Sequence, residues 1–284
     1  MYFANMKRIT FVALSVLFIQ MNSHAQYFVD IFSFNRQAYN IPSGAQTSDF
    51  FVNAFIPKVL KSGNTIFVRA GYEKLELKND TLSAQYSSFT LPVGMQVQLK
   101  NPKVKFSGLI VPRIAAADLG DSFSDIFQLG VFSLFTVTES DKFRYKFGLY
   151  YNRDFFGNFF VPLVGVDWKV SDRFSLFGTL PQSFKASYAI LPSRVNAGLA
   201  FRSLTRSFRG EDVNTFVRYN ELQFKTFFDF YITKKNVVFV EGGYFLGKTP
   251  LLYNNSDVKT PLPSNLLKEG KAFPVFNAGW ALRF

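Results

Sequence analysis

The sequence predicts an all-β fold, a transmembrane antiparallel up-and-down β-barrel of about 14 strands. Three observations predict it. Apolar and polar residues alternate over long segments, the connections between these segments are alternately short and long, and the N-terminal residues have the features of an export signal. A tilted strand needs about 9–11 residues to cross a bilayer, whereas strands of soluble proteins usually have about 5–6.

The segment Ser88–Lys100 shows the alternation most clearly. Its odd-numbered residues, from Phe89 to Leu99, are all apolar, and its even-numbered residues are polar or small apart from Pro92. Successive side chains of a strand point to opposite faces, so a period of two indicates a strand. Three other segments show the same period: Phe143–Asn152, Phe160–Val170 and Leu222–Ile232.

The connections distinguish a membrane barrel from a soluble β-sandwich, which also alternates. Short ones occur at residues 61–64, 101–103, 140–142, 171–173, 192–194 and 234–236. Longer ones come between them, at residues 40–47, 78–84, 118–125, 154–158, 206–214 and 251–272. Short periplasmic turns that alternate with longer extracellular loops are typical of outer-membrane barrels. The sequence therefore also predicts which end of the barrel faces outward.

The predicted strand count is 14, with Thr179–Gln182 as one short outer turn. The two strands that flank Pro181 carry the weakest pattern, and without them the count is 12. An even number returns both ends of the barrel to the periplasm. The predicted strands are 28–39, 48–60, 65–77, 85–100, 104–117, 125–139, 143–153, 159–170, 174–180, 184–191, 195–207, 215–233, 237–249 and 273–284.

Residues 1–25 have the composition of a secretory signal peptide. Lys7 and Arg8 supply the positive charge, the apolar stretch Ile9–Met21 is too short to span a bilayer, and Ser23–Ala25 is a small-x-small cleavage site. The alternative is an N-terminal membrane anchor. Cleavage would leave residues 26–284 as the barrel and place it in the bacterial outer membrane.

The last strand carries an assembly signal. Phe276, Ala278, Trp280, Leu282 and Phe284 share one face. This pattern resembles the C-terminal signal that the barrel-assembly machinery of Gram-negative bacteria reads. An ordinary final strand is the alternative, because the chain has 37 Phe. The expected partners are this machinery, outer-membrane lipid and lipopolysaccharide.

The middle of the chain resembles a family of uncharacterised outer-membrane β-barrel proteins from Bacteroidota. The resemblance is carried by Phe147–Ile190, with a Phe-Gly loop, the sequence VGVDWKVSDR at a tight turn, and then GTLPQSFKASY. It extends over nearly the whole chain after residue 25. It implies a barrel and carries no known activity.

The scarcity of histidine and cysteine limits the catalytic chemistry that the chain can perform. The chain has no Cys, and its single His is His24, inside the predicted signal peptide. Barrel hydrolases use a histidine as general base, so the mature chain is predicted not to be an enzyme and to need no cofactor. The net charge of +12 does not predict nucleic-acid binding, because the basic residues are spread along the chain.

Charged residues at inward positions are predicted to line a polar lumen. Four carboxylates among them, Asp167, Glu221, Asp229 and Glu241, could pair for hydrolysis, but salt bridges with neighbouring cations are the favoured interpretation. The lumen candidates are Arg69, Arg144, Lys146, Asp167, Lys169, Glu221, Lys225, Asp229 and Glu241.

Two outer regions were weighed as ligand sites. Asp118, Asp121 and Asp125 share a loop, but their spacing does not match a Ca²⁺-binding pattern, so no metal is predicted. Arg202, Arg206 and Arg209 rise toward an outer loop, where arginine can bind lipopolysaccharide phosphates; a solvated basic rim is the alternative.

Two functions follow from the predicted fold. The first is a passive, porin-like pore for small solutes, because 14 strands enclose a wider lumen than eight. The alternative is a structural or surface-binding barrel with an occluded lumen, which large inward residues such as Phe67, Tyr150, Phe227 and Tyr231 favour. Residues 251–272 form the longest loop and either fold inward or cover the top. Substrate and oligomeric state are left open by the sequence.

Overall fold

The computed structural model describes residues 29–41, 45–80, 83–246, 250–263 and 272–284. The predicted signal peptide, residues 1–25, lies outside these ranges, as does the stretch 264–271 of the last loop. Within the described ranges, no helix has the length and apolar character needed to cross a membrane.

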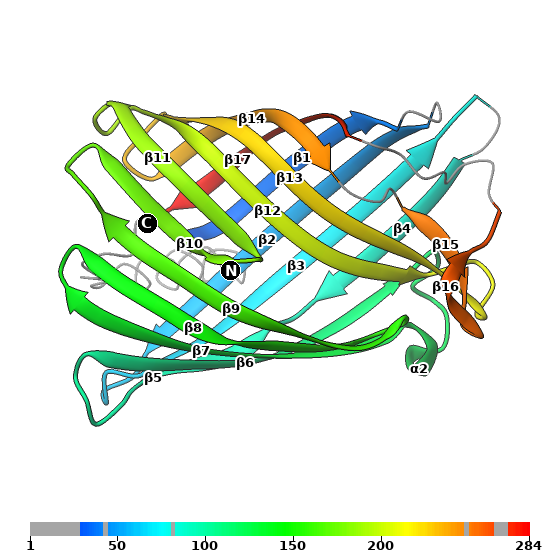
Figure 1. Ribbon diagram of the computed structural model, residues 1–284, viewed down its shortest axis with the longest axis horizontal. Helices are drawn as coiled ribbons and strands as arrows, with labels where there is room; N and C mark the ends of the chain where they lie inside the picture. Colours follow the sequence, from blue (N-terminus) through cyan, green and yellow to red (C-terminus); the bar gives the residue numbers. More distant parts are fainter. Residues whose placement is uncertain (1–28, 42–44, 81–82, 247–249, 264–271) are drawn as a thin grey trace, which may run out of the picture.

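The described residues form a closed antiparallel barrel of 14 strands, as the sequence predicts (Figure 1). Each strand pairs with the next along the chain, and β1 closes the barrel on β17 in a register that joins Tyr39 to Val275. The described residues contain 17 strand segments: β4 and β5 together make one barrel strand, and β15 and β16 lie in the last loop. They are β1 (Asp30–Asn40), β2 (Gln46–Val59), β3 (Thr65–Lys78), β4 (Ser83–Thr90), β5 (Val93–Gln98), β6 (Val104–Ala116), β7 (Phe127–Ser140), β8 (Phe143–Asp154), β9 (Gly157–Lys169), β10 (Phe174–Leu180), β11 (Ser183–Leu191), β12 (Val195–Arg209), β13 (Thr215–Tyr231), β14 (Asn236–Leu246), β15 (Leu251–Asn254), β16 (Asp257–Pro261) and β17 (Phe273–Arg283).

The predicted strand 85–100 is divided into β4 and β5. Pro92 has no N–H to donate to a sheet, so the strand is interrupted at Leu91 and Pro92. The register with β3 is unchanged across the interruption, because Gly71 lies opposite Thr90 and Val68 lies opposite Val93. The two segments therefore count as one strand of the barrel.

The last loop forms a hairpin beyond the barrel wall. β15 pairs with the first residues of the long β13, where Phe216 lies opposite Tyr253, and β16 pairs back on β15. The short helix α2 (Phe123–Ile126) lies in another loop at the same end. The described part of the last loop thus lies beside the first residues of β13, beyond the residues that β13 pairs with β14.

The two ends of the barrel differ. The turn end holds the six short turns, and beside them the N–H and C=O of Val29 pair with Phe284. The loop end holds the other connections, several of which are shorter than predicted. β8 and β9, for instance, stay paired up to Asp154 and Gly157, which leaves a two-residue turn instead of a loop over 154–158. Gly157 permits this turn because it adopts a positive φ of 111°.

Apolar side chains cover the outer face of the barrel at alternate positions. Phe276 and Trp280 of the predicted assembly signal lie on this face, and the Trp280 ring is 5.8 Å from that of Phe34 on β1. An outward apolar band is what lipid contact requires. Other exposed members include Phe160, Val164, Leu199, Phe224 and Tyr244.

The barrel narrows at the loop end because β12 meets β6 directly. Arg209 pairs in parallel with Ala116, and the Ala117 N–H donates to the Arg209 carbonyl at 2.9 Å. The strands that close this narrower ring are β12, β13, β14, β17, β1, β2, β3, β4 and β6.

Buried apolar residues fill this ring. Phe208, Tyr219 and Phe245 are fully buried at its centre, and the Phe245 ring stacks on Phe273 at 4.7 Å. Side chains can fill a barrel of about eight strands completely. The buried members of this loop-end core are Tyr39, Ile41, Ala45, Leu75, Leu77, Tyr86, Ala115, Phe208, Val217, Tyr219, Phe245, Phe273 and Val275.

The loop-end core should contribute strongly to stability. Phe208→Ala should lower the free energy of unfolding by about 3–5 kcal/mol, because it leaves a cavity among buried rings. The matched control is Phe123→Ala, which removes the same atoms from an exposed ring of α2. Reversible denaturant unfolding in lipid vesicles measures both. Equal losses for the two variants would contradict a packed core at this end.

Candidate functional site

Beneath the loop-end core lies a cavity of about 760 Å³ inside the barrel. It extends from Arg206 to Pro57 and Thr65, beside the first tight turn. Its wall is mainly apolar, with polar and charged side chains gathered toward the core. The apolar lining includes Phe51, Phe55, Phe67, Leu109, Val111, Phe132, Leu134, Phe159, Val161, Leu163 and Leu204.

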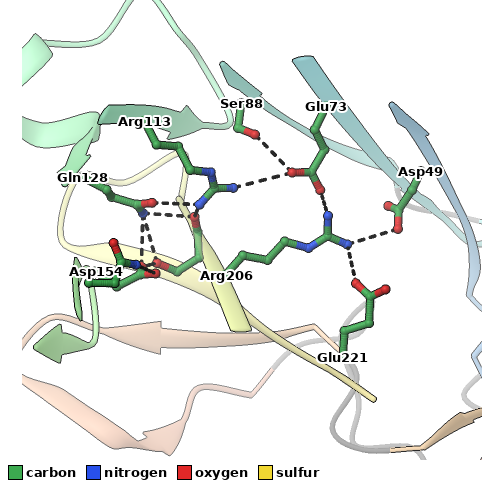
Figure 2. A network of polar contacts seen from close by, with 10 residues as sticks. Asp49, Glu73, Ser88, Arg113, Gln128, Asp154, Arg206 and Glu221 are labelled. Carbon is green, nitrogen blue, oxygen red and sulfur yellow. Dashed lines mark hydrogen bonds and ion pairs between the residues drawn. The ribbon is translucent and has the colours of Figure 1, made fainter. Parts of the chain in front are cut away.

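A buried ion network separates the cavity from the loop-end core, and Arg206 of β12 is at its centre (Figure 2). Its Nη2 lies 3.2 Å from an oxygen of Asp49 on β2 and 3.1 Å from one of Glu221 on β13. Its Nη1 contacts Glu73 on β3. All four groups are buried, and two further cations balance the three carboxylates: Arg113 lies 3.6 Å from Glu73 and Arg202 lies 3.6 Å from Glu221.

Arg113 of β6 continues the network across the lumen. Its Nη1 donates to Gln128 Oε1 at 2.7 Å and to the Ser207 carbonyl at 2.9 Å, and its Nη2 lies 3.6 Å from Glu73. Gln128 in turn donates to Asp154 at 3.1 Å. Glu73 therefore links the two arginines, and the network joins β2, β3, β12 and β13 to β6, β7 and β8 (Figure 2).

Aromatic rings hold the arginines in place. The Arg206 guanidinium lies 4.5 Å from the centre of the Tyr219 ring, and that of Arg113 lies 4.9 Å from the Phe208 ring. Both rings belong to the loop-end core. Desolvated cation–π contacts of this kind are worth about 2 kcal/mol, so they fasten the ion network to the apolar core above it.

The structure places the predicted lumen carboxylates in separate ion pairs. Asp167 lies 2.6 Å from Lys146, Asp229 lies 2.6 Å from Arg283, and Glu241 contacts both Lys225 and Lys185. Glu221 belongs to the Arg206 network. Because each carboxylate has its own cation, these four do not form the adjacent pair that carboxylate-only hydrolysis needs.

The remaining predicted lumen residues are three cations, which lie in different parts of the barrel. Arg69 lines the cavity, 5.6 Å from the Phe55 ring. Arg144 lies opposite Asp167 in the register of β8 and β9. Lys169 is near the turn end, where its Nζ is 3.0 Å from Asp172 and holds the pKa of that exposed carboxyl below its usual value, first through a hydrogen bond and then through its charge.

The three arginines predicted to contact lipopolysaccharide all contact residues of the barrel itself. Arg206 is buried in the network, and Arg202 lines the cavity 3.6 Å from Glu221. Arg209 lies over the Phe155 ring and donates to the Asp125 carbonyl at 2.8 Å. Arg202 and Arg206 have the inward parity of β12, and Arg209 lies where β12 meets β6. Contact of these arginines with lipopolysaccharide stays a prediction.

The acidic loop of Asp118, Asp121 and Asp125 is fully described. Within the described residues, no group of three or more His, Cys, Asp or Glu is arranged to hold a metal ion. Asp118 instead accepts a hydrogen bond from the Gly120 N–H at 2.8 Å. This loop contributes to the site only through the Asp125 carbonyl that Arg209 contacts.

Sequence reasoning missed most of the ion network. Asp49, Glu73, Arg113 and Asp154 were not singled out, although each has the inward parity of its strand. A search for charged residues at inward positions near the loop end of each strand would have found them. The contact of Asp49 and Glu73 with Arg206 was not predictable, because β12 is not a neighbour of β2 or β3 in the sheet.

Comparisons with known proteins assign the chain to no family: no family model matches it, and no curated protein matches it. Solved structures of outer-membrane β-barrels match the chain with TM-scores below 0.5. The closed antiparallel barrel of 14 strands is therefore established by the strand pairing of the chain itself. The family resemblance of Phe147–Ile190 stays a prediction.

Three of these solved structures show how low the sequence identity is. The NanC porin is 8% identical, with 88% of this chain and 98% of that chain covered and a TM-score of 0.41. The translocator domain of the autotransporter NalP from Neisseria meningitidis is 12% identical, with 99% and 96% covered and a TM-score of 0.42. An outer-membrane channel from Pseudomonas putida F1 is 9% identical, with 94% and 100% covered and a TM-score of 0.47. The likeness concerns the fold alone.

The ion network should be essential for stability. Arg206→Met leaves Asp49, Glu73 and Glu221 without their shared cation, so unfolding should become easier by about 3–5 kcal/mol. Arg36→Met is the control, because exposed Arg36 contacts only Ser48 in the described part of the chain. Denaturant unfolding in vesicles compares them. If Arg206→Met costs no more than Arg36→Met, the network has no structural role.

Proposed function

We propose that this chain is an outer-membrane β-barrel that binds a small ligand in a blind lumenal cavity, rather than a passive porin-like pore open along its axis. One observation carries the proposal: the loop-end core and the ion network together fill the cross-section above the cavity. This is the occluded-lumen alternative of the sequence analysis.

The cavity supports a binding role. Sites for small molecules commonly enclose about 300–1,000 Å³ and combine an apolar wall with a few placed polar groups. The cavity has this size and composition, with Arg69, Gln96 and Asn152 among its polar lining. A porin-like pore is favoured by the 14-strand circumference and by the polar residues nearer the turn end, but it requires an exit that the loop-end core occupies.

Location and assembly follow the sequence analysis. The outward apolar band supports insertion in the bacterial outer membrane, with the loop end facing outward. Recognition by the assembly machinery through Phe276, Trp280, Leu282 and Phe284, and contact with lipopolysaccharide, are further parts of the proposal. No catalytic role is proposed, since His24 is the single histidine of the chain.

Electrical recording tests the closed loop end. The purified full chain in planar lipid bilayers should give no steady single-channel steps, because the filled ring leaves no aqueous path for ions. Replacing two rings of the loop-end core, as in Phe208→Ala/Tyr219→Ala, should produce conducting steps or flickering openings. The control Phe224→Ala/Phe228→Ala alters lipid-facing rings and should stay silent. Steady steps from the unmodified chain would overturn the proposal.

A further inference from the structure

The barrel wall has a window beside the cavity, between β9 and β12. Within the described residues, no backbone pairing joins residues 157–163 of β9 to residues 204–208 of β12. The hairpin of β10 and β11 separates the two strands below this level and ends at Pro181 and Gln182. The last contact at the hairpin tip is the Ser203 N–H, which donates to the Gln182 carbonyl at 3.0 Å.

The short hairpin explains the window. β10 has only 7 residues, whereas a tilted strand needs about 9–11 to cross the hydrocarbon. Because β10 ends early, β9 loses its partner beyond Val164, which lies opposite Leu180. The missing part of the wall is on the loop side of the hairpin, which corresponds to the outer leaflet when the loop end faces outward.

A polar clasp closes the window at the loop end. Gln128 donates to the Ser207 carbonyl at 3.1 Å, and the Ser207 hydroxyl contacts Asp154. Arg209 holds the Asp125 carbonyl slightly further out. The hairpin tip below and this clasp above leave an opening of limited height, framed by β9 and β12.

The frame is apolar and leads into the cavity. Phe159, Val161 and Leu163 of β9 line the cavity from one side, and Leu204 of β12 lines it from the other. The tip residues Pro181 and Gln182 line it from below. Pro162 lies on the unpaired edge of β9. Because proline has no N–H, this position leaves no unpaired donor in the lipid.

The opposite wall offers a cation. β3 and β11 are seven strands apart in the 14-strand ring, so Arg69 of β3 lies across the lumen from the hairpin. Four arginines line the cavity: Arg69, Arg113, Arg202 and Arg206. In the described part of the chain, Arg69 is the one among these four with no carboxylate within 4.0 Å, and its side chain is open to the lumen.

We infer that the cavity takes a single-chain amphiphile with an anionic head group, such as a long-chain carboxylate, through the β9–β12 window from the outer leaflet. The head group pairs with Arg69, and the apolar chain lies along Phe159, Val161 and Leu163. The acidic groups of the lining, Glu73 and Asp154, are engaged in the ion network, so neither of them pairs with Arg69. This inference rests on the proposed blind cavity.

Binding measurements test the charge. Wild-type protein in phosphatidylcholine nanodiscs should bind radiolabelled hexadecanoate saturably. Arg69→Gln should weaken that binding about tenfold, since a charge-assisted hydrogen bond is worth about 1.5–3 kcal/mol. The same variant should leave binding of hexadecan-1-ol unchanged, and the outward Arg36→Gln should leave both unchanged.

A second pair of variants tests the window. Leu204→Trp should block the opening and abolish binding of both probes, whereas Leu199→Trp, on the lipid face of the same strand, should not. If Leu204→Trp does not assemble, Val161→Phe narrows the window from the β9 side.

Several results would overturn the inference. These are the absence of saturable hexadecanoate binding, full binding by Arg69→Gln, and equally tight binding of the water-soluble hexanoate. A silent barrel that fails to bind hexadecanoate refutes only the amphiphile, whereas steady conductance of the unmodified chain refutes the blind cavity itself.

Discussion

The structure depends on which partners the backbone N–H and C=O groups find along one edge of β12. Backbone N–H and C=O groups in a membrane must find partners within the protein, because hydrocarbon offers none. The part of this edge nearer the turn end pairs with β11, and the last residue of β12, Arg209, pairs with Ala116 of β6. Between these two contacts the edge has no neighbouring strand among the described residues. The narrow ring, the ion network and the window all follow from this change of partner.

The change of partner sets what the interior can hold. At the loop end the strands close into a ring small enough for side chains to fill, so rings such as Tyr219 and Phe245 are fully buried there. Nearer the turn end all 14 strands surround the lumen, and a cavity remains. The ion network lies at the boundary because it satisfies charges from strands that face one another only where the barrel narrows.

The same arrangement distinguishes two routes into the cavity, one along the barrel axis and one through the wall. The axial route meets a layer of mutually compensating charges and then an apolar core, and both resist opening because removing one member leaves another unpaired or leaves a void. The lateral route meets no ladder of hydrogen bonds between β9 and β12 in the described chain. The apolar frame of that route contrasts with the cationic side chain of Arg69 on the far wall. The interior is therefore asymmetric in the way an amphipathic ligand is.

The sequence by itself determined the strands and their faces. A period of two is a local property, so residues such as Phe276 and Glu221 could be assigned to lipid and lumen from parity alone. It also located the short hairpin at Pro181, and the chain breaks at Pro92 for a reason visible in the sequence. Only the tertiary structure decided that β12 bends to β6, and hence that Arg206 meets Asp49 and Glu73. The reason is physical: contacts between strands that are not neighbours depend on where a short hairpin lets the wall fold inward, and no local pattern encodes that.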